Sequence, residues 1–310
     1  MIIAALAGGV GGAKLAQGLA RLLPPGNLTI IVNTADDFEH LGLRICPDLD
    51  TVCYTLAGIS SRQTGWGRAN ESWNTITALG QLGGPAWFRI GDRDLATHLE
   101  RTRRLHRGEP LSQVVREFSD AWGIEHLILP MTDSPVATIV RTNEGDLAFQ
   151  EYFVHRECRP RVHGFEFLGI DAALPAPGVV EALTSADAII ICPSNPWVSI
   201  APILAVPFIR SLVAGGKAVA VSPIVGGRAL RGPAAKMYSE MGMKPSALAV
   251  ATQYQDIVDG FVMDHGDVEL TEAIRELGMQ TLVCSTVMHS LRDRRQLAGD
   301  VLDFLQAGWK

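Results

Sequence analysis

Residues Met1 to Leu15 read MIIAALAGGVGGAKL, and this stretch decides the fold. A short apolar run ends in four glycines within five positions, and apolar residues at helical spacing follow from Ala13 to Leu23. A strand, a glycine loop and a helix N-terminus together offer unpaired N–H groups and the positive end of a helix dipole to an anion. The stretch therefore predicts a buried strand that leads into a nucleotide-phosphate site.

The composition of the chain is typical of a cytoplasmic enzyme. Its 310 residues are 47% hydrophobic and 19% charged, and the formal net charge of −6 argues against a nucleic-acid partner. No run approaches the roughly 18 apolar residues that span a membrane, so no membrane partner is expected. The five cysteines form no Cys-x-x-Cys pair, which favours buried free thiols over zinc or redox sites. We expect small-molecule substrates.

Short apolar runs that alternate with helical patterns predict an α/β fold with a Rossmann-like, mostly parallel sheet. A turn sequence at residues 143–146 also predicts an antiparallel hairpin, formed by residues 137–141 and 147–153. We predict a nucleotide-binding core from residues 1–51 and 126–310. Residues 52–125 are predicted to form a mostly helical insertion that contributes to the pocket for a second substrate. The strands predicted for the core are 28–32, 127–130, 188–192, 217–222, 261–264 and 281–284.

Four acidic side chains follow the first two predicted strands. Asp36 and Asp37 stand at the carboxyl end of the second strand, where the ligand crevice of a doubly wound sheet lies. Asp48 and Asp50 follow just before a helical stretch. Together they could hold Mg²⁺, which prefers a few carboxylates combined with phosphate oxygens and water. The alternative is that these acids only cap helices or lie in solvated loops.

The glycine stretch matches neither of the two familiar phosphate motifs. A P-loop needs Gly-Lys followed by Ser or Thr, whereas Ala13-Lys14-Leu15 stands here, and the Gly-x-Gly-x-x-Gly pattern fails at Lys14. The alternatives are therefore a phosphate loop with Lys14 reaching the anion, or a tight turn without ligand and a solvated lysine. Because no His pair and no Ser-His-Asp signature is present, carboxylates with a metal favour phosphoryl transfer.

Seven motifs taken together resemble the 2-phospho-L-lactate transferases. The resemblance covers residue 1 to about residue 265, and each motif alone is weak, whereas their order and spacing are specific. The motifs are Gly8-Gly-Val-Gly-Gly-Ala-Lys-Leu15, Asn33-Thr-Ala-Asp-Asp37, Pro47-Asp-Leu-Asp-Thr51, Gly91-Asp-Arg-Asp-Leu-Ala-Thr-His98, Leu129-Pro-Met-Thr-Asp133, Pro193-Ser-Asn-Pro196 and Ser222-Pro-Ile-Val-Gly-Gly227.

The resemblance implies a reaction and a partner set. The family moves a phospholactyl or phosphoenolpyruvyl group from a guanosine-diphospho-linked donor to the ribityl 5′-hydroxyl of the deazaflavin Fo (7,8-didemethyl-8-hydroxy-5-deazariboflavin). The reaction releases GMP and is a step in coenzyme F(420) biosynthesis. The resemblance further implies a requirement for Mg²⁺, a Rossmann-like fold with an inserted helical region that contributes to the Fo pocket, and a homodimer.

Residue roles are carried over only where the motifs match. Asp50 and Asp36 are expected to be catalytic and to hold the metal, with Asp50 as the base and with Asp37 and Asp48 as reserve ligands. Val10 departs from the family pattern, in which threonine is common at this position. The resemblance assigns Fo binding to Asp50, Arg89, Asp92 and His98. It assigns the guanosine diphosphate to Gly9, Gly11, Gly12, Lys14, Ser194, Asn195 and Gly226.

Two other functions fit parts of the pattern. A non-catalytic regulator of the gluconeogenesis-factor type, which binds nucleotide sugars, would share the glycine opening and the core. Such a regulator would not be expected to carry both the Pro-Asp-Leu-Asp-Thr and the Gly-Asp-Arg-Asp segments. A nicotinamide dehydrogenase with Asp36 on the ribose is disfavoured by the broken glycine pattern.

Overall fold

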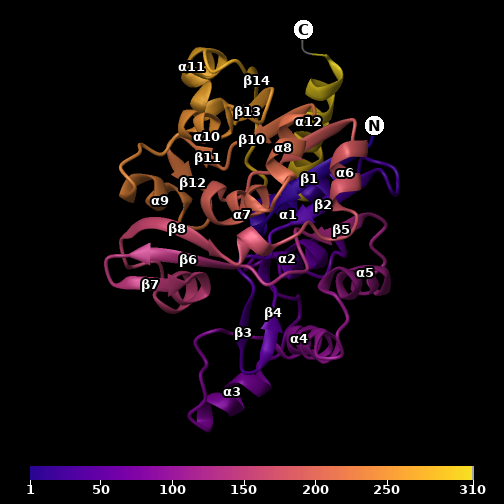
Figure 1. The fold of residues 1–310 in the computed structure, drawn as a ribbon, viewed down its shortest axis with the longest axis vertical. Coiled ribbons are helices and arrows are strands. Elements are labelled where there is room, and N and C mark those ends of the chain that lie inside the picture. Colours follow the sequence, from indigo (N-terminus) through magenta and orange to yellow (C-terminus); the bar gives the residue numbers. More distant parts are fainter. Residues whose placement is uncertain (309–310) are drawn as a thin grey trace.

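A parallel seven-stranded sheet organises the computed structural model, which describes residues 1–308 (Figure 1). Strands β2 and β5 lie on one side of β1, and β9, β10, β13 and β14 follow in that order on the other side, so the strand order reverses between β1 and β9. Ligands of such sheets bind at the carboxyl ends of the strands on either side of that reversal. The strands in spatial order are β14 (Gln280–Cys284), β13 (Gly260–Asp264), β10 (Ala218–Val221), β9 (Ala188–Ile191), β1 (Ile3–Ala7), β2 (Leu28–Val32) and β5 (Leu127–Pro130).

Helices cover both faces of the sheet, which explains why its strands are apolar on both sides. In β1, Ile3 and Ala5 face one layer, whereas Ala4 and Leu6 face the other. The first layer consists of α1 (Gly9–Ala20), α2 (Pro47–Leu56), α5 (Leu111–Ala121) and α12 (Leu291–Gln306). The second consists of α6 (Val179–Ser185), α7 (Ala201–Ala205), α8 (Ile209–Ala214), α9 (Ala234–Glu240), α10 (Ala247–Tyr254) and α11 (Thr271–Arg275).

Smaller elements stand beside the main sheet. A three-stranded antiparallel sheet pairs β6 (Ala137–Thr142) with both β7 (Gly145–Ala148) and β8 (Val162–Leu168). Figure 1 shows the hairpin of β3 (Phe38–His40) and β4 (Leu43–Ile45), with α3 (Asn74–Gln81) and α4 (Asp92–Leu105), at the opposite end of the molecule from α11. The short pair β11 (Ile224–Val225) and β12 (Arg228–Ala229) follows β10.

The structure corrects three details of the sequence-based expectations. Helix α1 begins at Gly9 and not after the glycines, so three of the four glycines belong to its first turn. The second hairpin strand ends at Ala148, and a π-helix at Glu151–His155 follows it. Helices α2 and α5 pack on the sheet, so the part standing away from the core is shorter than 52–125, and residues 57–73 contain no helix.

Within residues 1–308, none of the helices combines the length and the apolar character required to cross a bilayer.

Candidate functional site

A pocket of ≈790 Å³ opens where the sequence predicts the crevice, at the carboxyl ends of the parallel strands. The loops after β1, β2, β9, β10 and β14 all contribute to its wall. The pocket continues between the insertion and the π-helix that follows β7. Of the residues expected to bind substrates or metal, those that line it are Gly9, Gly11, Lys14, Asp36, Asp50, Arg89, His98, Ser194 and Asn195.

The N-terminus of α1 is used differently from the sequence prediction. The Gly9 N–H donates to Asp48 Oδ1 at 2.8 Å, and the Gly8 N–H donates to Ser194 Oγ at 3.0 Å. The Ser194 hydroxyl in turn donates to the Gly8 carbonyl oxygen at 2.8 Å. A carboxylate of the chain itself therefore occupies the anion position at the start of this helix.

The glycines of this turn allow a second loop to approach. A Cβ on Gly11 would lie under 3.0 Å from the carbonyl oxygen of Pro193, and a Cβ on Gly12 would lie equally close to Ser194 Oγ. The loop after β9 thus packs directly on the backbone of α1. Gly11 still lines the pocket, whereas Gly12 supports the wall from behind.

Two buried acids, Asp36 and Asp48, lie near the glycine turn and have no ion-pair partner among the described residues. Burial and the nearby Asp48 raise the pKa of Asp36 well above its usual range, and burial raises that of Asp48 to about 6. Asp36 Oδ1 is buried and has no hydrogen-bond partner among the described residues. Asp48 Oδ2 accepts the Asn33 amide at 3.0 Å, and the Ser199 side chain also hydrogen-bonds to the Asp48 carboxylate. A cation between two such carboxylates would offset the cost of their burial.

Asp37 points away from the pocket, although it directly follows Asp36. Its side chain is fully buried, and the guanidinium of Arg44 lies 3.5 Å from Oδ2. Burial raises the pKa of Asp37 to about 7, and Arg44 opposes that rise. Asp37 does not line the pocket, so it is a structural group behind the site.

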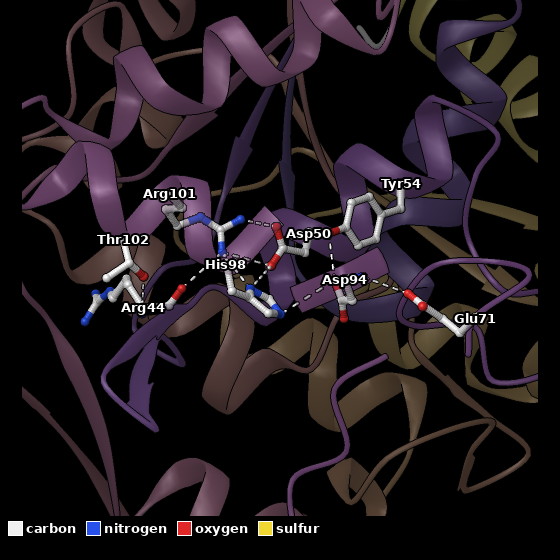
Figure 2. Close-up of polar contacts among 8 residues, drawn as sticks. All are labelled: Arg44, Asp50, Tyr54, Glu71, Asp94, His98, Arg101 and Thr102. Carbon is white, nitrogen blue, oxygen red and sulfur yellow. Dashed lines mark hydrogen bonds and ion pairs between the residues drawn. The ribbon is translucent and has the colours of Figure 1, made fainter. Parts of the chain in front are cut away.

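Asp50 is held by an arginine that lies outside every motif quoted above (Figure 2). Arg101, only 1% exposed, donates through both terminal nitrogens to the two Asp50 oxygens, at 3.1 Å for the Nη1–Oδ2 bond. Bidentate pairs of this kind fix the orientation of the carboxylate. Arg101 Nη1 also contacts the Nδ1 of His98 at 3.3 Å. Because a guanidinium can only donate, that contact favours the His98 tautomer with its proton on Nε2.

The other side of His98 faces a second carboxylate. His98 Nε2 lies 3.6 Å from Asp94 Oδ1, and the Tyr54 hydroxyl donates to the same oxygen at 2.7 Å. The backbone N–H of Asp94 is bound by Glu71, as Figure 2 shows. The network therefore fixes Asp50, His98 and Asp94 along one wall of the pocket.

A metal fits one part of this site better than the other. Ligand atoms of Asp50, Asp94 and His98 lie within 4.8 Å of one another. Arg101 already supplies a full positive charge there, and it would repel a divalent cation. Asp36 and Asp48 lack such a counter-charge and offer an unpartnered oxygen. The acids present thus fit Mg²⁺ at Asp36 and Asp48 and disfavour it at Asp50.

The far end of the pocket is aromatic. Trp87, Phe88, Phe149 and Phe153 line it, and the last two rings stack at 5.3 Å with an interplanar angle of 8°. These two phenylalanines are four residues apart, which suits the helical turn that replaces the predicted strand. Arg89 lies over the ring of Trp73, 4.4 Å from its centroid. Flat rings of this kind can stack on a planar ligand.

Three of the expected site residues serve the scaffold. The Asp92 carboxylate accepts from the N–H groups of Asn74 and Thr75, both at 3.0 Å, and so caps α3. The Gly226 N–H donates to the Asp267 carboxylate at 3.1 Å. Neither Asp92, Gly226 nor Gly12 lines the pocket.

The sequence analysis missed two residues of the site: Asp94, which lines the pocket, and Arg101, which is buried behind Asp50. Together with His98 they occupy positions four and three apart on α4, which is the spacing of one helix face. Asp92 lies on a different face, although it belongs to the same motif. The spacing of these residues along a predicted helix could therefore have identified Asp94 and Arg101 from the sequence.

Comparisons with known proteins point to one family. A family model described as "2-phospho-L-lactate transferase CofD" matches residues 3–293. A phosphoenolpyruvate transferase of Kitasatospora aureofaciens is 42% identical over 97% of both chains. A 2-phospho-L-lactate transferase of Methanosarcina mazei is 38% identical over 94% of this chain and 96% of its own length.

Solved structures share the architecture. Two crystal structures of BH3568 from Bacillus halodurans, one of them described as a member of the UPF0052 family, align with TM-scores of 0.62 and 0.64. The sequence identities are 15% and 16%, and the alignments cover 97% of this chain and 98% and 99% of those chains. At this identity the likeness shows the fold alone.

Proposed function

The chain belongs to the 2-phospho-L-lactate transferase family, and we propose that it transfers a phospholactyl or phosphoenolpyruvyl group to Fo. The donor is a guanosine-diphospho-linked three-carbon acid, and GMP is released. The transfer is a step in coenzyme F(420) biosynthesis. A homodimer is part of the same proposal, because the family resemblance implies it, and a cytoplasmic location is proposed from the free thiols.

The observation that carries the proposal is that one pocket is lined both by aromatic rings and by the loops at the carboxyl ends of the parallel strands. Its aromatic end, formed by Trp87, Phe88, Phe149 and Phe153, suits the flat deazaflavin ring of Fo. The other end lies against the loops of the parallel sheet, where nucleotides bind in doubly wound folds. Asp36, Asp48 and Asp50 lie on the wall of the same pocket, as transfer between two ligands requires.

Mg²⁺ is assigned to Asp36 and Asp48. When bound, the ion would neutralise charge that develops on the transferred phosphoryl group. The support is the unpartnered Asp36 oxygen and the raised pKa of both acids. This assignment replaces Asp50 with Asp48, one of the two reserve ligands, as the second metal ligand.

Asp50 is assigned the role of binding the acceptor hydroxyl of Fo. Arg101 fixes its carboxylate at the pocket wall and leaves oxygen lone pairs for a substrate O–H. In that position it would align the 5′-hydroxyl of Fo and receive its proton during transfer. Arg89 and His98 line the same pocket and are assigned to Fo binding.

The direct test is product analysis. The purified protein is incubated with Fo, Mg²⁺ and each guanylyl-linked donor in turn, and the deazaflavin product is identified by mass spectrometry. Phospholactyl-Fo is expected from one donor, and a product lighter by one pair of hydrogen atoms is expected from the enolpyruvyl donor. If Fo binds, as followed by its fluorescence, but no donor yields a product, a binding-only role replaces the proposal.

A further inference from the structure

Two of the backbone donors at the helix end that the sequence predicts as the phosphate site are already used within the chain. Asp48 accepts the Gly9 N–H, and Ser194 accepts the Gly8 N–H, so these donors are not free for a ligand. The Asp48 carboxylate would also repel a phosphate placed directly on this turn. Besides the Mg²⁺ assigned to Asp36 and Asp48, the two phosphates of a nucleoside-diphosphate-linked donor would gain from a further source of positive charge in the same pocket.

Four cationic side chains gather beside the glycine turn, and we name Lys14, Arg62, Arg231 and Arg294 the basic cluster. Lys14 and Arg231 line the pocket, and Lys14 donates to the Met288 carbonyl oxygen at 2.6 Å. Arg294 stands one layer behind and donates to Gln17 Oε1 at 2.5 Å. Burial lowers the pKa of Lys14, and the nearby charges of Arg294 and Arg231 lower it further.

Arg231 lines the pocket and contacts the insertion. Its guanidinium donates to the Thr64 carbonyl oxygen in the loop between α2 and α3. Gly65, with φ +80°, lets this loop pass close to Arg231, since a Cβ there would lie under 3.0 Å from Nη1 and 3.0 Å from Val10. The arginine therefore bridges the insertion and the glycine turn.

The basic cluster lacks a free counter-charge within the described residues. Asp293 is the acid that acts on both Lys14 and Arg294. Its carboxylate already accepts the N–H groups of His289 and Ser290, at 2.9 Å and 2.7 Å, as the cap of α12. Arg294 Nε is buried without a hydrogen-bond partner. Half-buried cations that repel one another are costly unless an anion joins them.

We propose that the basic cluster binds the diphosphate of the donor, with Lys14 and Arg231 in direct contact and with Arg62 and Arg294 adding to the field. The glycine turn instead binds the Asp48 carboxylate and packs against the loop after β9. The identity of the anion as a nucleoside diphosphate rests on the proposed function, whereas the presence of an anion site rests on the charges alone. Thr64 and Trp66 complete the wall around the phosphates.

The test measures binding of GDP, inorganic pyrophosphate, guanosine and Fo to the full chain in Mg²⁺ by titration calorimetry. Two variants, Arg231→Gln and Lys14→Gln, each remove one cation. Arg228→Gln is the matched control, because Arg228 on β12 is three residues before Arg231, is exposed and does not line the pocket. Each of the two variants should weaken GDP and pyrophosphate binding by roughly tenfold.

Guanosine and Fo binding should stay unchanged in both variants, which also shows that they fold. The Arg228→Gln control should bind GDP as the parent chain does. Unchanged GDP and pyrophosphate affinity in both variants overturns the proposal. Equal weakening in Arg228→Gln also overturns it, because the effect would then come from net charge. Cluster-dependent pyrophosphate binding in a chain that makes no product supports the cluster and contradicts the transferase proposal instead.

Discussion

Arg101 shows how a single buried side chain organises the site. The residue is 1% exposed, and its guanidinium neutralises the charge of the Asp50 carboxylate through a bidentate pair. Removing one partner of a buried pair leaves the other charge uncompensated. The same guanidinium sets the tautomer of His98 and bonds to the Arg44 carbonyl oxygen at 3.3 Å.

We expect Arg101→Met to lower the free energy of unfolding by about 3–5 kcal/mol, because Asp50 loses its buried partner. Urea unfolding measures this change. Arg103→Met, on the exposed side of the same helix, should leave the unfolding midpoint nearly unchanged, since its pair with Glu100 is solvated. Equal effects of the two variants would contradict the role given to Arg101.

Asp37 predicts a pH dependence of stability. Its pKa in the folded protein is raised to about 7, so the ionised form is disfavoured by folding. The resulting loss of stability therefore grows as the pH rises from the pKa of the unfolded state toward 7, and the full loss persists above pH 7. Asp37→Asn removes this cost. Relative to the parent, the variant should therefore gain stability between pH 5 and pH 8, on the order of 2 kcal/mol.

Urea unfolding at the two pH values, without metal, measures the difference. Asp146→Asn serves as the control, because Asp146 lies exposed on β7. A constant stability difference between Asp37→Asn and the parent across this range would refute the assignment.

At the scale of elements, the first turn of α1 depends on contact with the loop after β9. Alanine favours helices over glycine, yet a Cβ on Gly11 would meet the Pro193 carbonyl oxygen. We expect Gly11→Ala to destabilise the fold by about 1–3 kcal/mol, because the backbone must shift. Thermal unfolding measures the change.

Gly299, inside α12, provides the control for this substitution. A Cβ there would meet Leu22 Cδ1 at 3.8 Å, an ordinary contact. Gly299→Ala should therefore stabilise the protein by about 0.5–1 kcal/mol through helix propensity. Opposite signs for the two variants are expected, and matching signs would mean that the loop contact is unimportant.

At the scale of the molecule, the two ends of the pocket come from different segments of the chain. The aromatic end belongs to the insertion and the π-helix, whereas the nucleotide end belongs to the sheet loops. The proposal therefore predicts that acceptor and donor binding can be disturbed separately.

Trp87→Ala should weaken Fo binding and raise the KM for Fo, because Trp87 lines the aromatic end. GDP affinity should not change. Fo fluorescence and GDP calorimetry measure the two effects, with Phe208→Ala, an exposed ring outside the pocket, as control. Loss of GDP binding in Trp87→Ala would argue against separate ends.

Sequence patterns predicted the α/β class, the strands of the main sheet and part of the pocket wall. Asp36, Asp50 and His98 were identified from local motifs, and all three line the pocket. Asp92 and Gly226 were expected there as well, but their hydrogen bonds hold the scaffold. Motif membership does not reveal the direction of a side chain.

The sequence by itself determined the fold class, because buried parallel strands and amphipathic helices leave strong local patterns. It also placed the site at the strand ends, since topology brings those loops together. Only the tertiary structure decided how charges pair across the chain. Asp48 meets Gly9, Arg101 meets Asp50, and Arg231 reaches the insertion through contacts between residues far apart in sequence, which no local pattern encodes.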